Sequence, residues 1–232
     1  MKRISLMLAF ALMVTLGFAQ KKDRTSAYNY LRSGKLNKAI EYIEKTITHE
    51  ATMNEAKTWA YRGDIYLQIA LTDNPEYKAL SDNPLQIAYD SYKKAMALPD
   101  SKEFVADMMT NMNVVAESFF NKGVEGFNQK DYTASMNAFI MAADVKSEIG
   151  VVDTSALLNA VAAADQAVKP AESIKINQRL LEAGFKNPGS TGRNFYERRQ
   201  CPRPTHARPG TSASDRLPTG EIFAGFHFPG GV

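Results

Sequence analysis

The chain has little of the chemistry on which most catalytic and metal sites depend. Its 232 residues include one cysteine and three histidines. The single cysteine, Cys201, excludes an intrachain disulfide and a cysteine-rich zinc site. His49, His206 and His227 are too scattered to indicate a catalytic constellation, and no glycine-rich loop with phosphate-binding spacing precedes a helix. We therefore predict a protein that is not an enzyme and that holds no cofactor and no metal.

The chain also lacks an excess of one charge over most of its length. The formal net charge of +3 comes from 28 basic and 25 acidic residues. Residues 187–232 hold six arginines and three acidic residues, which accounts for the whole excess, and the preceding residues carry 22 of each sign. Without a basic stripe, we expect no binding to nucleic acid.

The N-terminal residues are typical of a secretory signal peptide over 1–19. A basic pair at the second and third positions precedes the apolar segment 4–18, and Ala19 stands directly before the expected cut at Gln20. About 15 apolar residues fall short of the roughly 20 that a membrane-spanning helix needs, although an uncleaved anchor is the alternative. We expect a periplasmic or secreted bacterial protein that keeps no stable membrane span after cleavage.

The stretch from Trp59 to Pro99 contains the strongest pattern in the chain. Two sets of three small or aromatic residues each have the spacing i, i+4, i+7, which places each set on one face of a helix. Small residues allow close helix approach, and aromatic residues fill the space between the helices. The two sets are Trp59, Gly63 and Tyr66, then Ala88, Tyr92 and Ala95.

This order resembles the tetratricopeptide repeat, a 34-residue helix–turn–helix unit with the pattern W-x-x-L-G-x-x-Y in its first helix. Weaker copies begin near residues 21, 101 and 157, on either side of the copy near 52. The resemblance covers 20–186 and implies an all-α fold, a right-handed α-solenoid of about four repeats. It also implies that the first helices line a concave groove that binds a peptide or partner domain.

Turn and breaker residues predict where several helices begin and end. Gly34 is expected to end a helix in the left-handed conformation, and Gly184 to end the last one. Pro84, after an insertion over 72–83, and Pro170 are expected to start helices. A continuous helical period predicts one long or slightly broken helix over 101–128.

The resemblance, applied position by position, implies which side chains face the groove. They lie on the first helix of each copy: Tyr28, Leu31, Arg32, Lys57, Ala60, Asp64, Leu67, Phe120, Val124, Phe127, Leu158 and Ala162. Phe120 and Phe127 stand out because packing inside one repeat does not require apolar residues there. Burial within the array is the alternative for both.

The C-terminal segment 187–232 differs in composition from the rest. It holds six of the ten prolines, seven of the fourteen glycines and no lysine. We predict a disordered Arg/Pro/Gly-rich tail, which is either a genuine binding tail or non-native sequence joined at a truncated repeat. In both cases the array lacks a polar capping helix.

The sequence favours a non-enzymatic interaction scaffold of the bacterial periplasm or envelope, with a protein or peptide partner of unknown identity. One alternative is a helical carrier of a small ligand or of Cu(I), for which Met108, Met109 and Met112 offer soft thioether ligands. Met108 and Met112 share a helical face with Phe104 and Val115, so we predict that they pack in the core. The other alternative is a helical bundle that associates with itself.

Overall fold

The computed structural model describes residues 21–185, so the predicted signal peptide and the tail 187–232 lie outside the described residues. Within 21–185 the structure contains nine α-helices and one short 3-10 helix, which confirms the all-α prediction for this part. The helices are residues 21–32, α2 (Leu36–Thr46), α3 (Ala56–Leu71), α4 (Pro75–Lys78), α5 (Pro84–Met96), η1 (Ser101–Glu103), α6 (Val105–Asn128), α7 (Tyr132–Glu148), α8 (Thr154–Gln166) and α9 (Pro170–Glu182).

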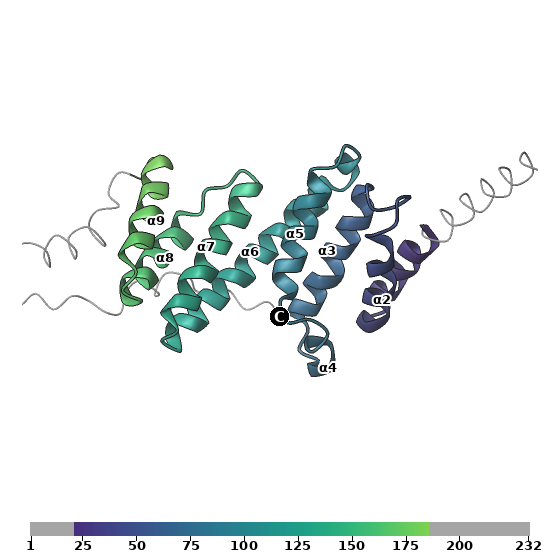
Figure 1. The fold of residues 1–232 in the computed structure, drawn as a ribbon, viewed down its shortest axis with the longest axis horizontal. Coiled ribbons are helices and arrows are strands. Elements are labelled where there is room, and N and C mark those ends of the chain that lie inside the picture. The colour runs from purple at the N-terminus through teal and green to yellow at the C-terminus, as the bar shows by residue number, and fades with distance from the viewer. Residues whose placement is uncertain (1–20, 186–232) are drawn as a thin grey trace, which may run out of the picture.

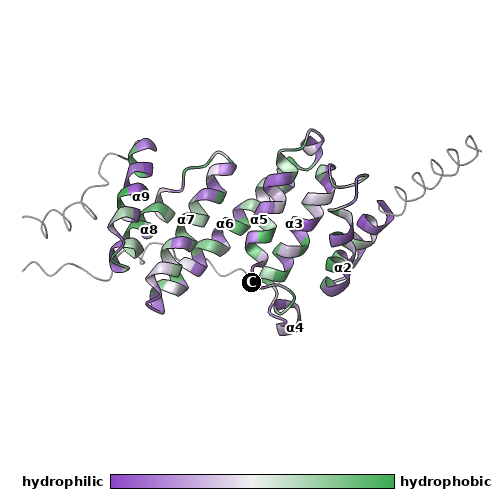
Figure 2. Ribbon diagram, in the orientation of Figure 1, coloured by the Kyte–Doolittle hydropathy of each residue, from purple (hydrophilic) through white to green (hydrophobic). Residues whose placement is uncertain are grey.

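The helices pack in sequential pairs that follow one another along the long axis of the molecule (Figure 1). The pairs are α3 with α5, α6 with α7, and α8 with α9, and the helix over 21–32 contacts α2 through the rings of Tyr30 and Tyr42. Adjacent pairs join through contacts of α2 with α3, α5 with α6, and α7 with α8. Hydrophobic residues alternate with hydrophilic ones along the paired helices, whereas α4 is hydrophilic (Figure 2). None of the helices in 21–185 is long and apolar enough to cross a bilayer.

Two glycines allow the paired helices to approach closely. A Cβ atom at Gly63 in α3 would lie 2.5 Å from Cε1 of Tyr92 in α5. A Cβ atom at Gly123 in α6 would lie 2.7 Å from the ring of Phe139 in α7. Both rings are completely buried, so each ring occupies the space that a side chain on the facing helix would need. The same kind of contact therefore occurs within the second pair and within the third, as the spacing of the small and aromatic residues predicts.

The observed helix ends agree with the predicted breaker residues. Gly34 and Gly184 follow helices and have φ values of +69° and +82°, which favour glycine. Pro84 and Pro170 are the first residues of α5 and α9. The long helix predicted over 101–128 is present with one break, because η1 ends at Glu103 before α6 begins.

The insertion over 72–83 contains the short helix α4, which the sequence pattern did not predict. Asn74 caps this helix, since its side-chain oxygen accepts a hydrogen bond of 2.9 Å from the backbone N–H of Glu76. Pro75 is its first residue, where the missing N–H costs nothing. A local cap and a proline thus fold part of the insertion into a helical turn beside α3.

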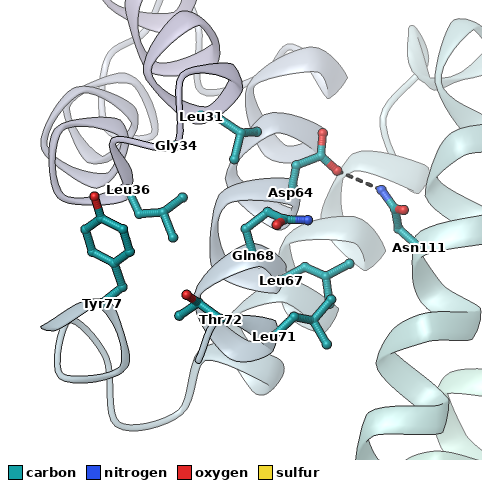
Figure 3. Close-up of a pocket in the computed structure, with 10 residues that line it drawn as sticks. All are labelled: Leu31, Gly34, Leu36, Asp64, Leu67, Gln68, Leu71, Thr72, Tyr77 and Asn111. Carbon is teal, nitrogen blue, oxygen red and sulfur yellow. Dashed lines mark hydrogen bonds between the residues drawn. The ribbon is translucent and has the colours of Figure 1, made fainter. Parts of the chain in front are cut away.

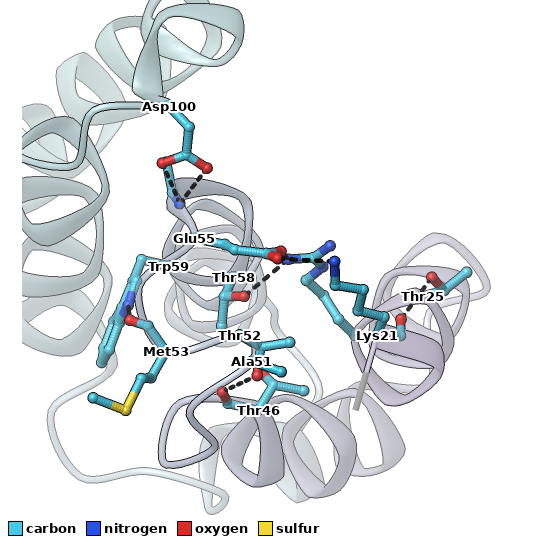
Figure 4. Close-up of polar contacts among 12 residues, drawn as sticks. Lys21, Thr25, Thr46, Ala51, Thr52, Met53, Glu55, Thr58, Trp59 and Asp100 are labelled. Atoms are coloured by element: carbon cyan, nitrogen blue, oxygen red, sulfur yellow. Dashed lines mark hydrogen bonds and ion pairs between the residues drawn. The ribbon is translucent and has the colours of Figure 1, made fainter. Parts of the chain in front are cut away.

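Polar contacts from distant residues fix the start of α3 (Figure 4). Both carboxylate oxygens of Asp100 accept from the backbone N–H of Ala56 at 3.0 Å, whereas the cap position itself, Glu55, makes no side-chain cap. Glu55 instead forms ion pairs with Lys21 at 3.3 Å and with Arg24. A carboxylate from the link between α5 and α6 therefore satisfies the first turn of α3.

Trp59 closes the loop that precedes α3. Its indole Nε1–H donates to the carbonyl of Met53 at 2.7 Å, and its ring is 9% exposed. Lys94 Nζ lies 3.8 Å from the ring centroid, in the range of a cation–π contact. In the same loop, the Thr52 hydroxyl donates to the carbonyl of Thr46 at 2.7 Å. The tryptophan thus holds the loop against both α3 and α5.

The close approach at Gly63 can be tested by adding one methyl group. We expect Gly63→Ala to lower the free energy of unfolding by about 1–3 kcal/mol, the usual cost of overpacking a core. Alanine has the higher helix propensity, so a loss of stability reports the clash with Tyr92. Urea denaturation measures the change. In a chain that carries Tyr92→Leu, the same Gly63→Ala change should lower the free energy of unfolding by less than it does opposite Tyr92. Unchanged stability of the single variant Gly63→Ala would contradict the packing described here.

Candidate functional site

A pocket in the described part of the chain lies where the first helices of three pairs meet the inserted helix α4 (Figure 3). Its volume is about 460 Å³, within the range of ligand-binding pockets. Its lining combines leucine side chains with a few polar groups. The residues are Leu31, Gly34, Leu36, Asp64, Leu67, Gln68, Leu71, Thr72, Tyr77 and Asn111.

Three of the predicted groove residues meet in this pocket. Leu31 comes from the helix over 21–32, and Asp64 and Leu67 come from α3. Asn111 of α6 completes the same wall, so the first helices of three consecutive pairs contribute to one surface. Tyr77 of α4 lies opposite, on the side of Leu36 (Figure 3).

Asp64 is the only acidic or basic side chain among the ten that line the pocket. Its Oδ1 accepts two hydrogen bonds, from the hydroxyl of Tyr92 at 2.8 Å and from Nδ2 of Asn111 at 2.9 Å. No lysine or arginine among the described residues forms an ion pair with it. The carboxylate therefore faces the pocket with neutral hydrogen-bond donors as its partners.

The surroundings of Asp64 disfavour its charge. Burial raises the pKa of this carboxyl above its ordinary value of 3.8 and outweighs the hydrogen bonds from Tyr92 and Asn111, which lower it. The nearby charge of Asp107 also raises the pKa. Burial and the Asp64 charge together raise the pKa of the Tyr92 hydroxyl, so this group stays protonated and remains a donor.

A second set of aromatic and basic side chains gathers around the part of α3 that lies one to two turns before Asp64. Tyr28 stacks on Tyr61 with ring centroids 4.4 Å apart and planes inclined by 16°. Lys57 Nζ lies 5.7 Å from the Tyr61 ring and 5.6 Å from the ring of Phe104. The sequence interpretation named Tyr28 and Lys57 and missed Tyr61, although Lys57, Tyr61 and Asp64 have the spacing i, i+4, i+7 of one helix face.

The structure places the other predicted groove residues away from the pocket. Phe120 packs edge-on against Phe139 with centroids 5.1 Å apart, and Phe127 packs in the same way against Tyr132 at 5.1 Å. Both side chains are half-buried between α6 and α7. The remaining members range from exposed to buried and do not line the pocket: Arg32 is exposed, Val124, Leu158 and Ala162 are half-buried, and Ala60 is buried.

The sequence interpretation missed seven of the ten lining residues: Gly34, Leu36 and Gln68, which lie within the first two predicted copies, and four others. Leu71 and Thr72 lie at the end of α3, and Tyr77 belongs to the insertion. Asn111 lies in the next pair. Leu71 is 46% exposed, a property that the structure shows and that the sequence pattern did not signal.

Two of the three methionines of α6, Met108 and Met112, are in the core, as predicted. Met108 and Met112 are 1% and 0% exposed, and Met109 is 37% exposed on the other side of the helix. Within 21–185 no group of three or more histidine, cysteine, aspartate or glutamate side chains is arranged to hold a metal ion.

The raised pKa of Asp64 predicts the stability of a variant without its charge. Since the folded protein holds the Asp64 proton more tightly than the unfolded chain, ionisation of this group costs stability as the pH rises past its ordinary value. Asparagine keeps the acceptor oxygen for Tyr92 and Asn111. We expect Asp64→Asn to be at least as stable as the original chain at pH 7, with the difference shrinking below about pH 4.

Urea denaturation of both proteins at several pH values measures this difference. Glu117→Gln, an exposed change on α6, controls for the loss of one negative charge. A loss of more than about 1 kcal/mol for Asp64→Asn at pH 7 would show that the charged carboxylate stabilises the fold.

Comparison with known proteins does not identify the chain. No protein-family model matches it, and no curated protein matches it. What is established is an all-helical domain whose helices pack in sequential pairs.

Proposed function

We propose that this chain is a non-enzymatic interaction scaffold, similar to tetratricopeptide repeat proteins, that binds a peptide or a segment of a partner protein. The observation that carries the proposal is the pocket lined by Leu31, Asp64 and Asn111, which come from the first helices of three consecutive pairs. In a helical-repeat array, one continuous surface made by equivalent helices suits an extended ligand. The proposal thus includes a solenoid arrangement of the four pairs.

Two further features support a binding surface. The stacked Tyr28–Tyr61 pair lies on the same two helices as Leu31 and Asp64, so an aromatic area adjoins the pocket along the chain direction. Rigid aromatic side chains are common anchors in protein interfaces. The pocket itself joins apolar walls to a few polar groups, a composition that gives both affinity and orientation.

Self-association is a second candidate, and the last described helix favours it. Ile174 and Leu181 of α9 are 65% and 46% exposed, and they lie seven residues apart on one helix face. A repeat array that ends on an apolar helix face has a surface suited to another helix. A second copy of the chain could supply that helix.

A matched pair of variants separates the two candidates. Leu71 lines the pocket and Leu181 lies on α9, and both side chains are 46% exposed. We expect Leu71→Arg to weaken binding of peptides selected from a random display library by about tenfold or more, because a large cation would enter the apolar wall. Leu181→Arg should leave that binding unchanged. Fluorescence anisotropy of labelled peptides gives the dissociation constants.

Circular dichroism should show that both variants keep their helicity, since both positions are at the surface. Equal binding by the two variants would contradict the proposed site. Analytical ultracentrifugation tests the second candidate: a dimer that Leu181→Arg converts to a monomer would support self-association through α9.

We also propose that the chain acts outside the cytoplasm, on the evidence of the segment 1–19. Expression of the full chain in a bacterial host should yield an exported protein that starts at Gln20. N-terminal sequencing of the periplasmic fraction measures this. Recovery only of an uncleaved, membrane-bound chain would contradict export as a free protein, and Ala19→Arg should block the cleavage.

A further inference from the structure

We propose that Asp64 makes the pocket select a peptide segment that carries a lysine or arginine side chain between apolar residues. This inference rests on the proposed function and names the chemistry of the partner. It depends on the hydrogen bonds of Asp64, on the absence of lysine and arginine from the residues that line the pocket, and on the leucine side chains in the same lining.

The carboxylate of Asp64 is held in place with one oxygen still available. Tyr92 and Asn111 both donate to Oδ1, at 2.8 and 2.9 Å. Figure 3 shows the second oxygen pointing away from Asn111. No described residue donates a hydrogen bond to Oδ2, so it can accept one from a ligand. A carboxylate oriented by two donors binds a cation without a further cost of ordering its own side chain.

Glu44 and Asp144 are half-buried carboxylates with an internal cation, whereas half-buried Asp165 forms no ion pair within the described residues. Glu44 accepts from Arg62 Nε at 2.8 Å, and Asp144 accepts from Arg179 at 2.6 Å. Asp64 is half-buried like them, yet the residues that line its pocket include no lysine or arginine. An external cation would remove this imbalance, which is the charge complementarity expected of a binding site.

The walls suit the stem of a long basic side chain. Leu31, Leu67 and Leu71 line the same pocket as Asp64, and lysine and arginine have apolar stems that pack on such surfaces while the charged group reaches a polar partner. The volume of about 460 Å³ exceeds that of one side chain, so flanking apolar residues of a peptide also fit. A divalent metal would need several oxygen ligands, whereas the pocket offers a single carboxylate.

The test uses two peptides that differ in charge and hardly in shape. They are Ac-Ala-Leu-Arg-Leu-Ala-NH2 and the same peptide with citrulline in place of arginine. We expect the arginine peptide to bind the purified chain about tenfold more tightly, as measured by calorimetry. The chain with Asp64→Asn should bind the two peptides equally. Glu117→Gln should keep the preference, because Glu117 lies on the surface of α6 away from the lining.

The outcomes separate this inference from the proposed function. If display-selected peptides bind and depend on Leu71, but the arginine and citrulline peptides do not differ or do not bind, the selection for a cation is wrong and the scaffold remains. If no peptide of either kind binds, both proposals fail. N-acetylarginine amide bound as tightly as the pentapeptide would indicate a site for a small cation and would overturn the peptide part.

Discussion

The contact between a glycine on one helix and a buried aromatic ring on the next determines how the paired helices pack. Tyr92 lies over Gly63, and Phe139 lies over Gly123, at distances that leave no room for a Cβ atom. Each ring is completely buried, so it sets both the separation of its two helices and their register. The apolar residues around each contact then bury the remaining faces of the pair.

The same contact connects the core to the pocket. The Tyr92 ring packs on Gly63, and its hydroxyl donates a hydrogen bond to the carboxylate of Asp64, the next residue along α3. Packing between α3 and α5 therefore helps to position the carboxylate that lines the pocket. Asn111 adds a second donor from α6, so the position of Asp64 depends on two consecutive helix pairs. The affinity of a ligand bound at Asp64 would therefore depend on the arrangement of both helix pairs.

How much the sequence predicts depends on whether a feature is local. The i, i+4, i+7 spacing around Gly63 and again around Tyr92 predicts the second pair, and Pro84 predicts the start of α5, because these signals operate within a few turns. The pocket depends on Tyr77 from the insertion and on Asn111 from the next pair, and no periodicity within one repeat locates them. The register of the repeat pattern assigned Phe120 and Phe127 to the predicted groove, but aromatic residues of α7 pack against both.

The cap on α3 limits how far this domain can be regarded as a set of interchangeable units. Asp100 lies after α5, in the link between the second and third pairs. Its carboxylate nevertheless accepts hydrogen bonds from the first turn of α3, where the second pair begins. A fragment or a shuffled array that ends at α5 would leave the Ala56 N–H without this acceptor. Each pair thus contains most of its own core, but the boundary of a self-sufficient module lies beyond residue 100 rather than at the end of α5.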